Sequence, residues 1–325
     1  MVPLWGEMGK LAMVSINHER RIVIQNREAS QNTMISSKPM PVASQSGQRL
    51  RAVSSRQNAQ VKKLREAFAQ ASSVEGFCAV EGIRLIEEAI RGRLKVHALF
   101  VRQSAQARAQ RILDQLSKHA EALLLPNDVF DSAVVTEHPQ GIAALVQIPH
   151  FDWKATLAPV PALVVIAAGI QDPGNLGTLI RSAEAFGATA VVSIEGTVSQ
   201  WNSKVIRASA GSVFRLPVLK TPSEELMSDL KSREIAALGL VAPRDGNGEE
   251  FDGSTPQRPR RLQDTNLIRP CALFTGNEGA GIPRELVSMM DEFVAIPQTR
   301  VESLNAGVAA SIALYEAQRQ RGTRA

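Results

Sequence analysis

Cysteine is scarce in this sequence, with Cys78 and Cys271 the only two among 325 residues. Two cysteines so far apart cannot supply a disulfide framework or a cysteine-based metal site. Each lies in an apolar run, so we expect two buried thiols in a reducing compartment. The histidines have no ligand-like spacing either; they are His18, His97, His119, His138 and His150. The sequence therefore predicts no metal site.

Aromatic residues, long apolar runs and nucleotide-binding fingerprints are missing as well. Aromatic side chains make up 4% of the chain, too few for base stacking to be the main contact with a nucleic acid. No apolar stretch is long enough to span a membrane, which predicts a soluble, cytoplasmic protein. Neither Gly-x-Gly-x-x-Gly nor Gly-Lys-Ser/Thr occurs, so the dinucleotide fingerprint and the P-loop are excluded.

Apolar and basic residues, in contrast, are abundant. With 44% hydrophobic residues, the 325-residue chain is long enough to form two ordinary domains. The net charge of +5 suits a polyanionic partner. One basic cluster precedes the acid Glu66 and predicts salt-sensitive contacts with nucleic-acid phosphates, although a solvated helix face would have the same pattern. Its members are Arg49, Arg51, Arg56, Lys62, Lys63 and Arg65.

The hydrophobic pattern divides the chain into four parts. Residues 1–47 have no sustained period and predict a disordered tail. Residues 48–150 predict a small α/β domain, residues 151–161 a proline-rich linker, and residues 162–325 a second domain. In the first domain the expected helices are Ala59–Ala71, Val80–Ile90 and Ala105–Leu116, and the expected strands are Val96–Val101, Ala122–Leu125 and Ile142–Ile148.

In the second domain strand and helix alternate, which predicts a mostly parallel sheet with helices on both faces. The run Leu163–Ala168 is continuously apolar, as in a strand buried on both sides. Helices are expected at Leu176–Phe186 and Leu304–Gln320, and the polar stretch 243–270 predicts an insertion. The other expected strands are Thr189–Ile194, Leu216–Leu219, Ile235–Val241, Cys271–Thr275 and Phe293–Ile296.

Three segments of the second domain combine small residues with isolated polar side chains. The first, residues 171–177 (Gln-Asp-Pro-Gly-Asn-Leu-Gly), joins a strand to a helix, where α/β proteins place binding loops. We expect Asn175 to cap this helix and Arg181 to face a ligand or water. The buried stripe should consist of Leu176, Leu179, Ile180 and Ala183. Alone, the segment is better explained as an ordinary turn and helix.

The second segment, residues 275–283 (Thr-Gly-Asn-Glu-Gly-Ala-Gly-Ile-Pro), follows another buried strand, and its glycines let a ligand approach the backbone closely. The third, residues 301–316, predicts a tightly packed helix capped by Ser303. Asn305 would then lie within its first turn and need a polar partner. The apolar stripe of this helix should consist of Leu304, Val308, Ile312 and Tyr315.

In this order the three segments resemble the signature motifs of the SpoU (TrmH-like) family of RNA ribose methyltransferases. The likeness extends over residues 160–320 and includes Asp-Pro-Gly-Asn-Leu-Gly followed by Arg181, then Gly-Asn-Glu-Gly, then Ser-Leu-Asn. Residues 207–211 and 214–218 are also similar to that family. The first domain resembles the ribosomal-protein-like α/β domain that is often attached to it, in residues 55–58, 80–82 and 139–142.

The resemblance implies a fold with a C-terminal trefoil knot, a homodimer, and S-adenosylmethionine as methyl donor without a metal. It implies that the donor is held by Thr275, Gly276, Ile296 and Leu304. The catalytic set that it implies is Asn175, Arg181, Glu278, Ser303 and Asn305. Because a guanidinium stays protonated in proteins, we expect Arg181 to grip the target phosphate rather than act as a base.

The implied activity is methylation of a ribose 2′-hydroxyl in ribosomal RNA, since the additional first domain resembles those of enzymes that act on ribosomal RNA. Three alternatives stay open. The substrate could be transfer RNA, the methylated group could be a base, or the chain could be a non-catalytic RNA-binding or ribosome-assembly protein with the same fold. The presence of all three motifs favours an enzyme.

Overall fold

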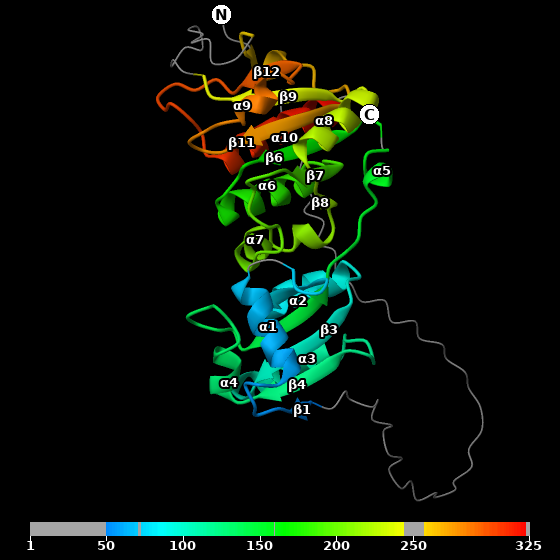
Figure 1. Cartoon of the computed structure of the whole chain (residues 1–325), viewed down its shortest axis with the longest axis vertical. Helices are drawn as coiled ribbons and strands as arrows, with labels where there is room; N and C mark the ends of the chain where they lie inside the picture. The colour runs from blue at the N-terminus through cyan, green and yellow to red at the C-terminus, as the bar shows by residue number, and fades with distance from the viewer. Residues whose placement is uncertain (1–49, 71–72, 159, 244–256, 323–325) are drawn as a thin grey trace, which may run out of the picture. The chain divides into compact units, whose positions relative to one another are not determined.

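The structure is a computed structural model that describes residues 50–70, 73–158, 160–243 and 257–322. The predicted tail and Arg49 lie outside the described residues. Within the described ranges the strands form two sheets, one built from the first half of the chain and one from the second (Figure 1). None of the helices found there is long and apolar enough to cross a membrane.

The first sheet has the strand order β1-β4-β3-β5-β2. Strand β3 is parallel to β4, whereas β5 is antiparallel to both β3 and β2. The strands are β1 (Arg51–Ala52), β2 (Phe77–Glu81), β3 (Val96–Arg102), β4 (Glu121–Leu125) and β5 (Ile142–Gln147). The helical segments are α1 (Ala59–Ala69), α2 (Ile83–Arg91), the 3-10 turn η1 (Gln103–Ala105), α3 (Gln106–Leu113) and α4 (Asn127–Asp131).

The predicted helix Val80–Ile90 is wrong at its start, because the chain is still in strand β2 there and α2 begins at Ile83. The turn between the two elements is made at Gly82, whose φ of +102° is disfavoured for residues with a side chain. Strand β2 lies between two apolar clusters, so its buried residues follow one another without alternation. Periodicity cannot separate such a short apolar run from a helix.

The second sheet has the strand order β10-β12-β9-β11-β6-β7-β8, and each of these neighbouring pairs is parallel. This confirms the predicted mostly parallel sheet. The strands are β6 (Leu163–Ala168), β7 (Ala190–Ser193), β8 (Val218–Lys220), β9 (Ala236–Val241), β10 (Arg260–Arg261), β11 (Cys271–Gly276) and β12 (Glu292–Ala295). The helical segments are α6 (Pro173–Ala185), α7 (Ser203–Ala208), η2 (Ser212–Phe214), α8 (Ser223–Ser232), η3 (Leu262–Asp264), α9 (Arg284–Val287) and α10 (Ala306–Gly322).

Strand β6 shows why this sheet is covered on both faces. Its alternate residues belong to different apolar clusters: Leu163, Val165 and Ala167 pack with residues of α6 and α10. The intervening residues pack with residues of α8 and α9 on the opposite side. The continuous apolar run predicted for this strand is therefore confirmed, with the same bounds.

Both cysteines lie in these interiors as free, buried thiols, as expected. Burial raises the pKa of Cys78 to about 12 and also raises the pKa of Cys271. A thiol with such a pKa holds its proton at neutral pH and is a poor nucleophile. Neither cysteine therefore has the properties of a reactive site.

Two segments predicted as irregular contain short elements. The predicted linker, residues 151–161, includes α5 (Trp153–Thr156), which is capped by the side chain of Asp152 and whose Trp153 indole donates to Asp229 on α8. The part of the predicted insertion that is described, from residue 257, supplies β10 to the second sheet. Both segments lack hydrophobic periodicity, and contacts with other elements of the fold stabilise their regular structure.

The C-terminal helix packs on the rest of the domain through its small residues. The prediction that its apolar stripe forms the packed face is wrong. Helix α10 packs against α6 and β11. Val308, Ile312 and Tyr315 are instead 43%, 37% and 56% exposed. The reason is steric, because a β-carbon at Gly307 would already lie 3.1 Å from the backbone oxygen of Asn175. The buried residues are Ala306, Gly307, Ala310, Ala313, Leu314 and Ala317.

Candidate active site

Helix α6 places the first motif at the carboxyl end of β6. Its cap is Asp172, whose Oδ1 accepts a hydrogen bond from the backbone nitrogen of Asn175 at 2.8 Å. The prediction that Asn175 is the cap is therefore wrong. Pro173 at the first helical position explains the difference, because its fixed φ starts the helix three residues earlier. The side chain of Asn175 is thereby available for another contact.

The cap of α10 is Asn305 rather than Ser303. Oδ1 of Asn305 accepts hydrogen bonds from the backbone nitrogens of Gly307 at 3.0 Å and Val308 at 3.2 Å. Ser303 is exposed and has no hydrogen-bonding partner among the described residues. The predicted cap at Ser303 is therefore wrong. Asn305 was expected to need a polar partner, and the first amides of its own helix supply part of this need.

A chain of three polar side chains connects the three motifs. Nδ2 of Asn305 donates to Oδ1 of Asn175 at 2.7 Å, and Nδ2 of Asn175 donates to the carboxylate of Glu278. The helix amides occupy Oδ1 of Asn305, so the amino group must face Asn175. The accepting oxygen of Asn175 then directs its own amino group to Glu278. Each amide orientation in the chain is thus determined by its neighbour.

The glycine-rich loop that carries Glu278 is folded tightly on itself. Asn277 bonds to Gly281 in both backbone directions at 2.9 Å, and its side chain accepts from the nitrogen of Gly279 at 2.9 Å. A β-carbon at Gly276 would lie 2.2 Å from the carbonyl carbon of Gly281. Glycine at 276 is therefore required by the approach of the loop to its own backbone.

Arg181 lies on the exposed side of α6, as predicted, and the predicted buried stripe of this helix is confirmed. It follows Asn175 by six residues, about 9 Å along the helix axis. No side chain or backbone group of the described residues forms a hydrogen bond or ion pair with it. The guanidinium is therefore available for a ligand.

Two buried polar atoms at the same edge of the sheet have no partner among the described residues. They are Oγ1 of Thr275, at the end of β11, and Oε1 of Gln298, just after β12. Strands β11 and β12 lie on either side of β9 and both pair in parallel with it, so these atoms lie at the same carboxyl edge of the sheet. Parallel sheets bind ligands at this edge. Gln298 was not predicted, although a polar residue directly after the Ile296-Pro297 pair is a signal that could have identified it.

The predicted phosphate-binding cluster is partly engaged within the first sheet's domain. Arg51 pairs with Glu121 and Arg56 with Asp128, each at 2.8 Å. Lys63 pairs with Glu75 at 2.6 Å.

A hydrogen bond from Arg56 lowers the pKa of Asp128, and one from Lys63 lowers the pKa of Glu75. Lys62 is exposed, and Arg65 donates to Ser132. The acids come from up to 72 residues downstream, so the run of charge in the sequence did not reveal them.

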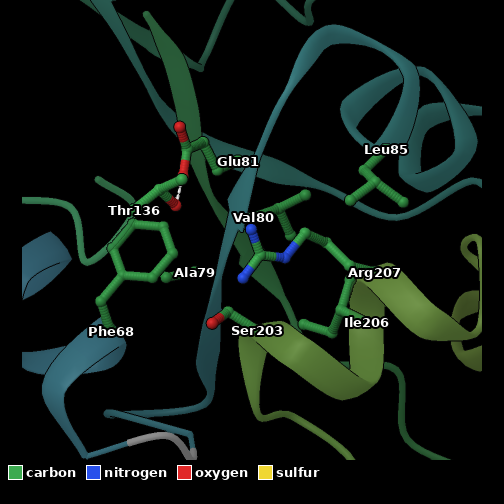
Figure 2. A pocket seen from close by; sticks show the side chains of 9 residues that line it. All are labelled: Phe68, Ala79, Val80, Glu81, Leu85, Thr136, Ser203, Ile206 and Arg207. Atoms are coloured by element: carbon green, nitrogen blue, oxygen red, sulfur yellow. Dashed lines mark hydrogen bonds between the residues drawn. The ribbon is translucent and has the colours of Figure 1, made fainter. Parts of the chain in front are cut away.

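A small pocket lies away from the three motifs, between β2, α2 and α7. Figure 2 shows the side chain of Arg207 on one side of it and Glu81, which bonds to Thr136, on the other. None of the motif residues lines this pocket. It is therefore separate from the candidate active site.

Comparison with known proteins identifies the family. Residues 162–315 match the SpoU rRNA Methylase family, and residues 58–144 match the MRM3-like substrate binding domain. RlmP of Bacillus subtilis (strain 168), a 23S rRNA (guanosine(2553)-2′-O)-methyltransferase, is 33% identical over 237 residues, which cover 73% of this chain and 86% of that protein. The chain belongs to the SpoU family of rRNA methylases. The resemblance seen in the three motifs is thus confirmed.

Streptomyces viridochromogenes supplies a further match in sequence and one in structure. A 23S rRNA (uridine(2479)-2′-O)-methyltransferase is 30% identical over 245 residues, covering 74% of this chain and 82% of that protein. The crystal structure of the SpoU methyltransferase AviRb in complex with the cofactor AdoMet matches with a TM-score of 0.69 and 26% identity. The match covers 82% of this chain and 99% of that chain.

Proposed function

We propose that this SpoU protein transfers the methyl group of S-adenosylmethionine to a ribose 2′-hydroxyl of ribosomal RNA. The observation that carries the proposal is the side-chain link between Glu278, Asn175 and Asn305, which joins all three family motifs beside the available guanidinium of Arg181. The relatives named as 23S rRNA 2′-O-methyltransferases support the substrate class.

The residues at the edge of the sheet fit the proposed donor. S-Adenosylmethionine supplies an activated methyl group on a sulfonium sulfur, and its amine and hydroxyl groups need hydrogen-bonding partners when buried. The orphaned oxygens of Thr275 and Gln298 can accept from such groups. The backbones of Gly276, Ile296 and Leu304 complete the proposed donor site around them.

In the proposed mechanism Arg181 holds the RNA. Its guanidinium remains charged and offers a planar pair of donors to a phosphate next to the target ribose. The 2′-hydroxyl loses its proton to water as it accepts the methyl group, and a positive charge at this point stabilises the negative charge that develops on its oxygen. Asn175 and Asn305 act through position: they hold the first motif against the second and third, so that the hydroxyl and the donor meet in one geometry.

The domain division that we propose assigns substrate binding to residues 48–150, joined by residues 151–161 to the catalytic domain of residues 162–325. The ion pairs of Arg51 and Arg56 are largely exposed. Exposed pairs contribute only about 0–1 kcal/mol, so RNA phosphates can displace their carboxylate partners. Together with Lys62, these arginines form the proposed RNA-binding surface, to which Lys63 and Arg65 also belong; Arg49, which we assign to the same function, lies outside the described residues.

We also propose that the enzyme is a homodimer with a knotted C-terminus. The exposed stripe of Val308, Ile312 and Tyr315 on α10 is an apolar surface suited to a second copy of the chain. At the other end of α10, Arg321 donates to the backbone oxygens of Leu267 and Ala162. These bonds hold the end of α10 against two segments that are distant from it in the sequence.

The function can be tested with the purified full chain, labelled S-adenosylmethionine, and separate samples of ribosomal and transfer RNA. We expect incorporation into ribosomal RNA, at a position that resists alkaline cleavage because its 2′-hydroxyl is methylated. Label in transfer RNA alone, or at an alkali-sensitive position, would assign another substrate or a base. Absence of label from both RNAs, with the donor present in excess, would contradict the enzymatic function.

Replacing Gln298 with methionine should have opposite effects on two measurements. The change removes an unsatisfied buried oxygen, so it should stabilise the donor-free protein by about 1–3 kcal/mol in chemical denaturation. It also removes an acceptor from the proposed donor site, so the affinity for S-adenosylmethionine should fall by roughly tenfold in calorimetry. The control is Gln318→Met on the exposed side of α10. Unchanged donor affinity in Gln298→Met would remove Gln298 from the donor site.

Replacing Asn305 with aspartate should separate its capping role from its contact with Asn175. Aspartate still accepts from the first amides of α10, so the melting temperature should stay within a few degrees of the wild-type value. It cannot donate to Asn175, and methyl transfer should fall by at least about tenfold. Asn305→Ala, which loses both roles, should also lose about 1 kcal/mol of stability. Full activity in Asn305→Asp would show that the link is dispensable.

A further inference from the structure

Arg215, directly after η2, forms ion pairs with helices that belong to different domains. Its Nε and Nη2 donate to the two carboxylate oxygens of Glu184 on α6, at 2.6 and 2.9 Å. Its Nη1 donates to the carboxylate of Glu88 on α2. One guanidinium therefore connects a helix of the substrate-binding domain with a helix of the catalytic domain.

This cluster is more buried than the ion pairs of the basic surface. The side chains of Arg215, Glu184 and Glu88 are 33%, 30% and 24% exposed, against 59% for Arg51. Burial alone would raise the pKa of Glu184, but hydrogen bonds from Arg215 and Ser212 outweigh it and hold the pKa below its ordinary value of 4.5. The two carboxylates raise the pKa of Arg215. Glu184 and Arg215 are therefore both charged at neutral pH.

The backbones on either side approach one another closely. Gly211 has a φ of +84°, and a β-carbon there would lie 2.7 Å from the β-carbon of Glu88. A β-carbon at Gly92 would lie 3.2 Å from the backbone oxygen of Phe214. Ile86 and Ala89 of α2 belong to the same apolar cluster as Phe214. Helix α2 is therefore docked against the segment that carries Arg215.

Glu184 lies one turn after Arg181 on the same helix, α6. We propose that Arg215 is a positioning residue, which fixes the orientation of the substrate-binding domain relative to Arg181 through its two carboxylate partners. The inference rests on the proposed function. RNA held by the first domain reaches the catalytic guanidinium in the correct geometry only while α2 and α6 are held by the same side chain.

The two arms of the cluster can be tested separately. Glu88→Gln removes the charged partner of Arg215 in the substrate-binding domain. Glu184→Gln removes its charged partner within the catalytic domain. We expect Glu88→Gln and Arg215→Gln to lower kcat/KM for ribosomal RNA by roughly 10- to 100-fold. The affinity for S-adenosylmethionine, measured by calorimetry, should stay unchanged because the donor site lies within the second domain. Glu225→Gln, on an exposed position of α8, is the matched control.

A double-mutant cycle distinguishes positioning from general destabilisation. If Arg215 acts through Glu88, the double variant should be no slower than the Arg215 variant alone. Arg215→Lys should rescue only in part, since an ammonium cannot reproduce the planar contacts to both carboxylates. Additive losses in the cycle, or wild-type kcat/KM in Glu88→Gln, would overturn the inference. Absence of methyl transfer by the wild-type protein would instead contradict the proposed function itself.

Discussion

Replacing Arg181 with alanine is expected to slow methyl transfer to ribosomal RNA by about 10²- to 10³-fold, the usual effect of removing one group that stabilises developing charge. Because the side chain is exposed and has no partner among the described residues, the melting temperature should not change. Affinity for the donor should also persist, since the proposed donor contacts come from β11, β12 and the start of α10. The measurement is single-turnover methylation at saturating donor.

Arg181→Lys distinguishes the two ways in which this charge can act. Lysine keeps the positive charge but not the planar pair of donors, so we expect activity between those of the wild type and Arg181→Ala. The control for a general loss of charge is Lys231→Ala, which removes an exposed cation from a different helix, α8. Full turnover in Arg181→Lys would exclude bidentate phosphate contact, and full turnover in Arg181→Ala would exclude any role in catalysis.

Replacing Gly276 with alanine should both destabilise the protein and abolish donor binding. The added carbon would lie 2.2 Å from the carbonyl carbon of Gly281, and a backbone atom cannot move aside as a flexible side chain can. We expect a loss of about 3 kcal/mol, at the upper end of the cost of overpacking. The loop must shift to relieve the contact, which separates Glu278 from Asn175. Chemical denaturation and calorimetry with S-adenosylmethionine measure the two effects.

Gly279 provides the matched control from the same loop. A β-carbon there would meet only Oδ1 of Asn277, at 3.6 Å, which is an ordinary contact. Gly279→Ala should therefore stay within about 0.5 kcal/mol of the wild type. If Gly276→Ala and Gly279→Ala proved equally stable and bound the donor equally well, the tight turn would have no role in the site.

Some elements could be predicted residue by residue and others could not. Strand β6 was predicted with its observed bounds, because a strand buried on both faces requires an uninterrupted apolar run and has no competing pattern. The helix predicted over Val80–Ile90 failed because β2 and α2 are both apolar and only one residue, Gly82, separates them. The predicted packed face of α10 was wrong because the size of the side chains, rather than their hydrophobicity, determines which face packs on α6.

The candidate site shows a similar division. Its residue types were predictable, since a donor loop needs glycine and a motif link needs amides and a carboxylate. The caps were misassigned because Asp172 and Asn175, like Ser303 and Asn305, are both good capping residues within a few positions of each other. Which of them caps depends on where the helix starts, and in α6 Pro173 at the first helical position makes Asp172 the cap.

From local pattern alone, the chain could be read as α/β with a mostly parallel second sheet, and its three motifs identified the SpoU family. The burial of a strand and the conformation of a turn depend on residues a few positions apart, so both can be predicted from the amino-acid sequence. The Glu278–Asn175–Asn305 link, the Arg51–Glu121 ion pair and the Arg215–Glu88 ion pair join residues 70 to 130 positions apart. Such contacts depend on directions and distances that exist only once both sheets have formed.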